Sequence, residues 1–276
     1  EGTASTYGGL AIASTLAWGL GYFGMPHILV RFMAIEDADK LKYSRRIGTI
    51  WVIISMSVAI FIGVIGYSVS QAGKIPFLGT SAESETIIIQ LANLLSSFGP
   101  LLAIVAGVVL AGIMASTMST ADSQLLVASS SFTSDIYKPI IRKNKASDKE
   151  MLWAGRIVVM VVSVISVFIA ASPNSGSIMS LVANAWGVFG AAFGPTIMLS
   201  LFWKRFNYTG ALVGIIVGAV VDIAWFTYLP HLGIYEIIPG FAAGLIATIV
   251  VTLLTKAPSK DVTDMFDKVA KGEIGE

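Results

Sequence analysis

The stretch LAIASTLAWGLGYFGMPHILVRFMAIEDADK, residues 10–40, contains the features that decide the fold. Its first part is apolar, but the glycines at Gly19, Gly21 and Gly24 are followed at once by Pro26. Proline removes a backbone donor and clashes with the preceding turn, and glycine lowers the cost of unwinding a helix. The pattern predicts a helix interrupted at membrane depth, which is tolerated only where protein or water satisfies the freed backbone groups. The alternative is an ordinary proline kink.

The composition places this stretch in a membrane protein. Of 276 residues, 55% are hydrophobic and only 13% are charged, against about 25% charged in soluble domains. A soluble enzyme of this size needs more polar surface, so that class is excluded. The chain has no cysteine, which excludes disulfides, thiolate metal sites and cysteine nucleophiles. The net charge of +1 indicates no general attraction to nucleic acid.

Seven apolar segments follow one another along the chain. A helix needs about 20 residues to cross a bilayer, and the segments are too continuous to be alternating barrel strands. We therefore predict an all-α membrane protein, with one transmembrane bundle over residues 1–256 and a tail over 257–276. The predicted spans lie near residues 7–23, 47–69, 101–118, 152–171, 178–203, 211–229 and 241–254.

The basic residues alternate between successive loops, as the positive-inside rule requires for seven crossings. Four regions carry nearly all of them, whereas the intervening loops carry only Lys74. The chain is therefore predicted to begin outside and to end in the cytoplasm. The basic positions are Arg31, Lys40, Lys42, Arg45 and Arg46; Lys138, Arg142, Lys143, Lys145 and Lys149; Lys204 and Arg205; and Lys256, Lys260, Lys268 and Lys271.

Two further helices are predicted outside the spans. The long second loop, 70–100, contains the apolar run 86–95, which is too short to cross. We interpret it as an extracellular helix on the bundle, serving either as a lid or only in packing. The polar tail repeats apolar residues at helical spacing, which predicts a short surface helix. These residues are Val262, Met265, Phe266 and Val269.

Aromatic side chains accompany the predicted break. Trp18 and Tyr22 are four residues apart and therefore share one helix face. Each combines a ring with one polar group, which suits contact with a small amphiphilic substrate. The alternatives are an interfacial aromatic belt or ordinary packing.

A stripe of hydroxyl residues marks the third segment, and we call it the hydroxyl seam: Ser116, Ser119, Thr120 and Ser123. Their spacing places them on one helix face. Hydroxyl oxygens and backbone carbonyls are ligands that a hard monovalent cation accepts, so the seam is a candidate sodium site. The alternative is that small hydroxyl residues line a helix contact or bond back to carbonyls.

Two carboxylates lie in or near apolar segments, where a charge is expensive and therefore a functional hypothesis. Asp122 adjoins the hydroxyl seam, and it either helps to hold a second cation or faces cytoplasmic water. Asp222 has no evident partner in the sequence.

At these residues a family resemblance enters. LAWGLGYFGMPHILVRFMA (16–34), IMASTMSTADSQLLVASSSFTSDIYK (113–138), YEIIPGF (235–241) and KAPS (256–259) resemble the sodium/solute symporter family, in particular its proline-transporting members. The resemblance covers essentially the whole chain and corresponds to the family's C-terminal half. It implies seven transmembrane helices from a leucine-transporter-type inverted-repeat bundle.

The resemblance also implies roles for matching positions. Trp18, Tyr22 and Pro26 correspond to residues of the proline site on the broken helix. Ser119 and Thr120 correspond to sodium-ligating hydroxyls, and Ser116 to a ligating backbone carbonyl. A second sodium ion in some relatives implies Asp122 and Ser123. This sequence has Met25 where the family motif has glutamine.

The function implied is sodium-coupled uptake of proline across the plasma membrane, with Na⁺ as the coupling ion and no enzymatic reaction. The other half of the ion site would come from N-terminal helices that this chain lacks, so the chain is expected to be a C-terminal fragment. The alternatives are a sodium-coupled symporter of another small solute (another amino acid, a sugar acid or an osmolyte) and a cation channel.

Overall fold

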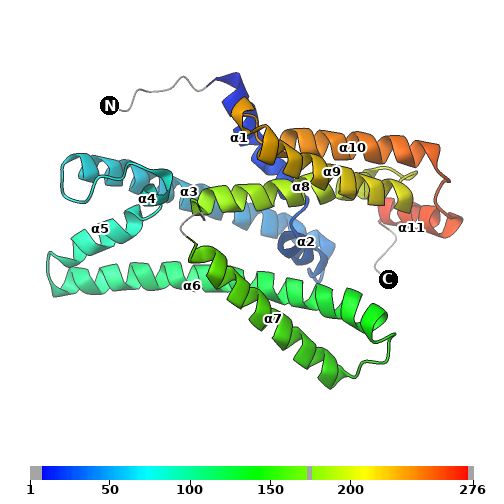
Figure 1. Ribbon diagram of the computed structural model, residues 1–276, viewed down its shortest axis with the longest axis horizontal. Coiled ribbons are helices and arrows are strands. Elements are labelled where there is room, and N and C mark those ends of the chain that lie inside the picture. The colour runs from blue at the N-terminus through cyan, green and yellow to red at the C-terminus, as the bar shows by residue number, and fades with distance from the viewer. Residues whose placement is uncertain (1–7, 173–175, 273–276) are drawn as a thin grey trace. The chain divides into compact units, whose positions relative to one another are not determined.

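The computed structural model describes residues 8–172 and 176–272, and every regular element within them is helical (Figure 1). The chain divides into two compact units. Unit 1 is formed by the chain up to Val30 and from Met179 onwards, and unit 2 by Arg31–Ile178. In the described part, six helices are long and apolar enough to cross a membrane: Ala38–Gln71, Pro100–Ile141, Asp148–Ala170, Ile178–Phe202, Tyr208–Tyr228 and Ile237–Leu254.

The first predicted span is the one that differs. Helix α1 runs over Gly9–Gly21 and α2 over Pro26–Met33. The 13 residues of α1 rise only about 20 Å, less than the roughly 30 Å of a bilayer core. The first segment is therefore divided between two shorter helices, and among the described residues the six helices named above reach the length of a span. The predicted start at residue 7 lies outside the described residues.

Two spans extend beyond their apolar parts. The 3-10 turn η1 (Ala38–Lys40) leads into α3 (Leu41–Gln71), which begins before the predicted residue 47. Helix α6 (Pro100–Ser131) begins at a proline, which is suited to a helix start. It continues as the π-helix η2 (Phe132–Ile141), well past the predicted end at 118. Hydropathy therefore located the apolar part of each helix but missed the polar residues at its end. These residues are still helical, although their composition is not that of a membrane span.

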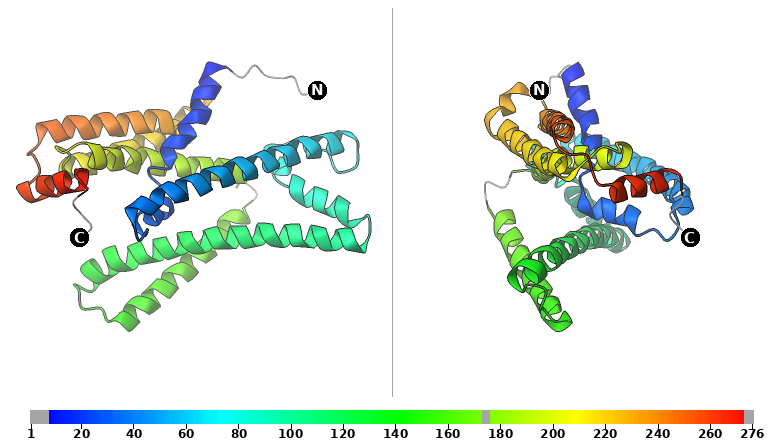
Figure 2. Two further views of the ribbon diagram at one scale, coloured as in Figure 1. Left: turned by 180° about the vertical axis from the view of Figure 1, so that it is seen from behind. Right: turned by 90° about the vertical axis from the view of Figure 1, so that its right-hand side faces the viewer.

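Unit 2 consists of α3, the short α4 (Ser81–Ser84), α5 (Ile87–Ser96), α6 with η2, and α7 (Asp148–Ala170). The predicted helix near 86–95 is confirmed as α5, and it packs against both α3 and α6. Gly66 of α3 allows the close approach of Ile87 and Leu91. Helices α6 and α7 form a hairpin (Figures 1 and 2), in which the Ser129 hydroxyl donates to the Gly155 carbonyl at 3.0 Å.

Unit 1 combines α1 with α8 (Ile178–Phe202), α9 (Tyr208–Tyr228), the 3-10 turn η3 (Pro230–Leu232), α10 (Ile237–Leu254) and α11 (Lys260–Ala270). Helices α9 and α10 lie side by side (Figures 1 and 2). The predicted tail helix is confirmed as α11, which is joined to the end of α8 by an ion pair of 2.5 Å between Lys204 Nζ and Asp267 Oδ2.

Candidate functional site

The break between α1 and α2 is confirmed at Tyr22–Met25. Within it the backbone makes short turn bonds, from the Gly24 amide to the Gly21 carbonyl at 3.0 Å and from the Phe23 amide to the Leu20 carbonyl at 3.3 Å. Pro26 begins α2, where its missing amide hydrogen would have no helical partner in any case. The residue before a proline is disfavoured in helical conformation, so α1 cannot continue through this point.

Close packing on α8 explains why glycines occupy this break. A β-carbon on Gly24 would collide with the carbonyl of Phe189, and one on Gly21 would collide with the indole of Trp186. From the other side, a β-carbon on Gly190 would lie 2.7 Å from the Cα of Gly21. The broken helix is therefore held against α8 by backbone-to-backbone proximity, which only residues without a side chain permit.

Four aromatic residues, which we call the aromatic cluster, meet beside the break: Trp18, Tyr22, Trp186 and Tyr235. The ring of Trp18 stacks on Trp186 with centroids 5.5 Å apart and on Tyr235 at 5.9 Å. Tyr22 contacts Trp186 edge-on at 4.8 Å. Tyr22 is exposed while Trp18 is half-buried, so the cluster presents a partly open apolar surface with polar groups at its edges.

Hydrogen bonds fix the rings in place. The Trp186 indole Nε1–H donates to the Trp18 carbonyl at 2.8 Å, and the Tyr235 hydroxyl donates to the Ala183 carbonyl at 2.8 Å. The Tyr235 amide donates to the Ser14 hydroxyl at 3.2 Å. These bonds connect α1, α8 and the segment before α10, so the position of the break depends on three parts of unit 1.

Sequence reasoning selected Trp18, Tyr22 and Pro26 but did not assign Trp186 or Tyr235. Both stand in stretches that the sequence alone marks as unusual, an aromatic and glycine-rich span and the YEIIPGF motif. Met25 is buried against Ala17, Trp186 and Ile237, so its thioether fills the core of unit 1 beside the break.

The hydroxyl seam lies on α6 in unit 2. Ser116, Ser119 and Thr120 are exposed within that unit and Ser123 is half-buried. The Thr120 hydroxyl donates to the Ser116 carbonyl at 3.2 Å, and the Ser123 hydroxyl donates to the Ser119 carbonyl at 3.0 Å. Each of these hydroxyls directs its proton toward its own helix, which leaves its oxygen lone pairs free for an acceptor role.

Asp122 is exposed on the same helix. The structure thus groups Trp18, Tyr22 and Pro26 in unit 1, and Ser116, Ser119, Thr120, Asp122 and Ser123 in unit 2. Each group is described within its own unit.

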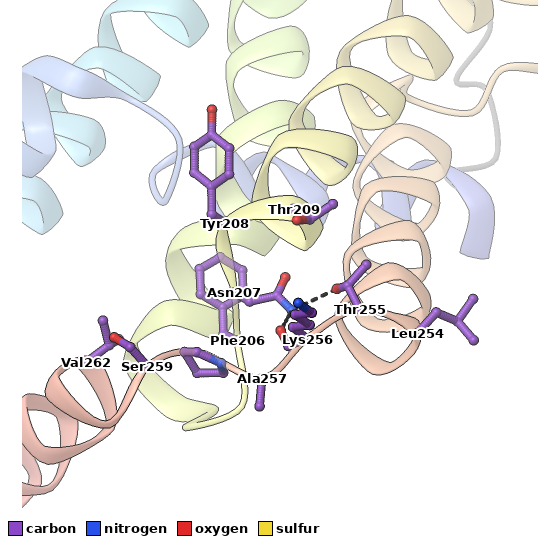
Figure 3. A pocket seen from close by; sticks show the side chains of 11 residues that line it. Phe206, Asn207, Tyr208, Thr209, Leu254, Thr255, Lys256, Ala257, Ser259 and Val262 are labelled. Atoms are coloured by element: carbon purple, nitrogen blue, oxygen red, sulfur yellow. Dashed lines mark hydrogen bonds between the residues drawn. The ribbon is translucent and has the colours of Figure 1, made fainter.

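One pocket of unit 1 lies away from all of these residues (Figure 3). It lies where the loop between α8 and α9 meets the end of α10, and Asn207 stands beside it. The Asn207 side chain donates to the Thr255 hydroxyl and to the Lys256 carbonyl, both at 2.8 Å, and accepts from the Gly210 amide at 2.9 Å. This residue caps α9 and ties the two loops together, which is a structural role.

With this geometry in place, comparison with known proteins decides the family. The sequence profile described as the Sodium:solute symporter family matches residues 7–218. The chain belongs to the sodium:solute symporter family. Among curated members of this family of symporters, the high-affinity proline transporter PutP of Bacillus subtilis is 47% identical over 259 residues, which cover 94% of this chain and 52% of that protein.

Two other symporter relatives agree. The sodium/proline symporter of Haemophilus influenzae is 44% identical over 266 residues, covering 95% of this chain and 51% of that protein. The sodium/proline symporter of Escherichia coli is 42% identical over 257 residues, covering 93% of this chain and 50% of its own length. The chain therefore spans about half the length of the curated relatives it matches.

Proposed function

We propose that this chain supplies the C-terminal half of a secondary active transporter that couples inward movement of Na⁺ to uptake of proline. The observation that carries the proposal is the break at Tyr22–Met25, held open beside the aromatic cluster. Discontinuous helices in transporters mark substrate and ion sites, because unwound backbone groups are available to a ligand. Family membership and the names of the relatives support sodium and proline as the pair transported.

The aromatic cluster suits the chemistry of proline. A pyrrolidine ring is a small apolar body that packs on indole and phenol faces, while its ammonium and carboxylate need polar partners. In our proposal Trp18 and Tyr22 contact the solute and Pro26 sets the geometry of the break. The free backbone groups of the break bind the polar end of the solute.

The hydroxyl seam is the proposed sodium site. Thr120 and Ser119 offer hydroxyl oxygens, and Ser116 offers its carbonyl oxygen, to which the Thr120 hydroxyl donates at 3.2 Å. The proton of the Thr120 hydroxyl is already directed to that carbonyl, so the oxygen can face a cation without reorientation. Asp122 and Ser123 lie one turn further along and are the proposed ligands of a second ion.

The remaining ligands are proposed to come from N-terminal helices of the complete protein, as half of the relatives' length lies outside the match. A sodium ion held between α6 and such a helix would tie two moving parts together, and coupling between ion and solute is then reciprocal. Moving one charge across 100 mV contributes about 2.3 kcal/mol, which supports roughly fifty-fold accumulation.

The basic loops support an orientation in the plasma membrane with the C-terminus in the cytoplasm. Sodium and solute would then be released on the cytoplasmic side, where the sodium concentration is low. In this proposal no chemical reaction accompanies transport.

The test is uptake by the complete protein in proteoliposomes, with an inward Na⁺ gradient and a matched K⁺ gradient as control. The solutes would be proline, other amino acids and sialic acid. We expect saturable proline uptake that requires Na⁺ at a fixed ion-to-solute ratio. Preferred uptake of another solute would redirect the substrate assignment, and a solute-independent, non-saturating sodium conductance would favour a channel.

A further inference from the structure

A row of small residues on α9 packs against a similar row on α10, and the row on α9 ends at a carboxyl group. Gly210, Gly214, Gly218 and Asp222 recur at every fourth position of α9, and all four are buried. Opposite them on α10 lie the buried residues Gly240, Gly244, Thr248 and Thr252. A β-carbon on Gly214 or Gly210 would collide with the hydroxyl of Thr248 or Thr252, respectively. The two helices are therefore in close contact, as small residues allow in membrane proteins.

Asp222 continues the row of small residues on α9 and is fully buried, with 0% of its surface exposed. Two glycines make room for its carboxyl group. Asp222 Oδ2 lies 3.1 Å from the position that a β-carbon would take on Gly187 of α8, and also 3.1 Å from that position on Gly240 of α10. The side chain thus points into a cradle formed by α8 and α10, which any larger residue at either glycine would fill.

A second carboxyl side chain converges on the same point. The Cγ of Glu236, the residue before α10, lies 3.1 Å from the same β-carbon position on Gly187, and Glu236 is 9% exposed. No donor among the described residues hydrogen-bonds to either oxygen of Asp222 or to Oε1 of Glu236. The unpartnered, buried side chain of Asp222 is therefore aimed at a second buried carboxyl group.

Two ionised carboxylates cannot persist together in such a place. Burial removes the water that stabilises each charge, and the two negative charges repel each other. Burial raises the pKa of Glu236 above its ordinary value. A further titratable group that interacts with both is the phenol of Tyr235, and α8 approaches the two side chains at Gly187. Tyr235 donates its own proton to Ala183 and cannot neutralise the pair.

The space around Asp222 and Glu236, between α8 and α10, suits a proton better than a metal cation as the species that neutralises the pair. A β-carbon on Gly240 would lie 2.8 Å from the Cβ of Ala191 and 2.8 Å from the Cβ of Asp222. Little space is therefore left beside Gly240, next to the carboxyl group of Asp222. A sodium ion needs a shell of several oxygen ligands, as hard oxygen-binding cations do. A proton needs only one carboxyl oxygen and a hydrogen bond to the second group.

We propose that Asp222 and Glu236 form a proton-binding carboxyl pair that holds at least one proton at neutral pH. Loss of this proton introduces repulsion between the two carboxylates, and so between α9 and the start of α10. Glu236 is preceded directly by Tyr235, whose ring stacks on Trp18, and Gly187 follows Trp186. The pair therefore connects external pH to the aromatic cluster, so that deprotonation loosens the surface beside the break. This inference does not depend on which solute or ion the protein carries.

The test is infrared difference spectroscopy on the complete protein in lipid, with aspartate labelled by ¹³C at the side-chain carboxyl. Wild-type protein at neutral pH should show a protonated carboxyl band that disappears on alkaline titration. The ¹³C shift reports whether the proton resides on aspartate or on glutamate, and either result supports the pair. No protonated carboxyl at neutral pH would overturn the proposal, and so would a band that sodium addition removes, because the pair would then be a cation site.

Variants assign the band to these residues. Asp222→Asn and Glu236→Gln keep the size of each side chain, and each should abolish or shift the band, whereas Asp264→Asn on the exposed face of α11 should leave it unchanged. Persistence of an unshifted band in both variants would overturn the assignment. If one of the two variants fails to fold, the other still assigns the band, because each should abolish or shift it by itself.

Discussion

The aromatic cluster and the hydroxyl seam differ in how far their own unit completes them. In unit 1, the rings of Trp18, Trp186 and Tyr235 contact one another and their polar atoms bond to nearby carbonyls. In unit 2, Ser116, Ser119 and Thr120 are exposed, and the hydroxyls of Thr120 and Ser123 donate to carbonyls of α6 itself. The first site is preorganised by tertiary contacts, whereas the second has its local geometry set by one helix.

Substitutions in the two proposed sites should therefore have different effects on stability and binding. A change in the aromatic cluster disturbs packing and solute affinity together, because the rings belong to the core of unit 1. A change in the hydroxyl seam removes a ligand without removing a packing contact.

The largest effect is expected at the break itself. Gly24→Val places side-chain atoms against the Phe189 carbonyl and near the Cα of Gly190, and backbone atoms cannot move away as a side chain would. We expect destabilisation of about 3 kcal/mol, at the upper end for overpacking, measured as a lower unfolding temperature and yield in detergent. Gly19→Val on α1 is the matched control, since nothing lies within 4 Å of a β-carbon there. Equal stability of the two variants would contradict the close approach of α1 and α8.

The next-largest effect is expected on sodium affinity, from changes in the hydroxyl seam. Ser119→Ala or Thr120→Ala in the complete protein should raise the sodium concentration for half-maximal uptake about tenfold, which corresponds to about 1.4 kcal/mol for a lost ligand. Protein level should stay unchanged, because these side chains are exposed in unit 2. Thr117→Ala is the control, as its hydroxyl bonds back to the Ile113 carbonyl at 2.9 Å and lies off the seam. Normal sodium dependence in both seam variants would remove the ion-site assignment.

A comparable but mixed effect is expected in the aromatic cluster. Trp18→Ala removes stacking on two rings and should weaken proline affinity about fivefold, since aromatic contacts contribute about 1 kcal/mol beyond burial. It should also lower the unfolding temperature, which the seam variants should not do. Leu16→Ala is the control because Leu16 is 74% exposed on the same helix. If Trp18→Ala lowers stability while solute affinity is unchanged, these rings only pack.

A smaller effect is expected for the second ion. Asp122→Asn should reduce the Hill slope for sodium while leaving solute affinity near normal, because Asp122 adjoins the hydroxyl seam on α6 and is exposed in unit 2. Sodium-dependent uptake over a concentration series measures it. An unchanged slope would argue that this carboxylate only faces water.

The smallest effect is confined to a loop of unit 2. Glu83 accepts from the amides of Gly79 and Thr80, and its side chain closes a capping box with Thr80 at the start of α4. The Thr80 hydrogen bonds lower the pKa of Glu83. The stabilisation is therefore present above the ordinary glutamate pKa and is lost as pH falls through the lowered value. Weaker protection of the α4 amides on acidification, measured relative to the intrinsic exchange rate at each pH, should show it, and Glu83→Gln should weaken that pH dependence.

Local sequence signals predicted much of this protein. The glycine and proline pattern located the break at Pro26, because a missing amide hydrogen and a restricted backbone act within one turn. Periodicity located the hydroxyl seam and the tail helix, because residues three and four apart share a face. Hydropathy located the spans but missed their ends, as α6 shows by continuing as helix past Met118 through the hydroxyl-rich part of the segment.

Contacts between distant residues could not be read in this way. Trp186 donates to the carbonyl of Trp18 across 168 positions of the chain, and Tyr235 meets Ser14 across 221. Neither pairing leaves a periodic or compositional signal. Asp222 appeared in the sequence as an isolated carboxylate in an apolar helix, and Glu236 as a residue of a loop.

By itself the sequence determined the all-helical membrane class, the interruption of the first segment and the single-sided array of hydroxyls, because each follows from interactions within a few residues. Only the tertiary structure decided that two indoles and a phenol gather beside the interruption and that two carboxyl groups converge on Gly187. The physical reason is that close packing of α1, α8, α9 and α10 depends on glycine seams from several segments fitting together, and such complementarity is a property of the folded surface.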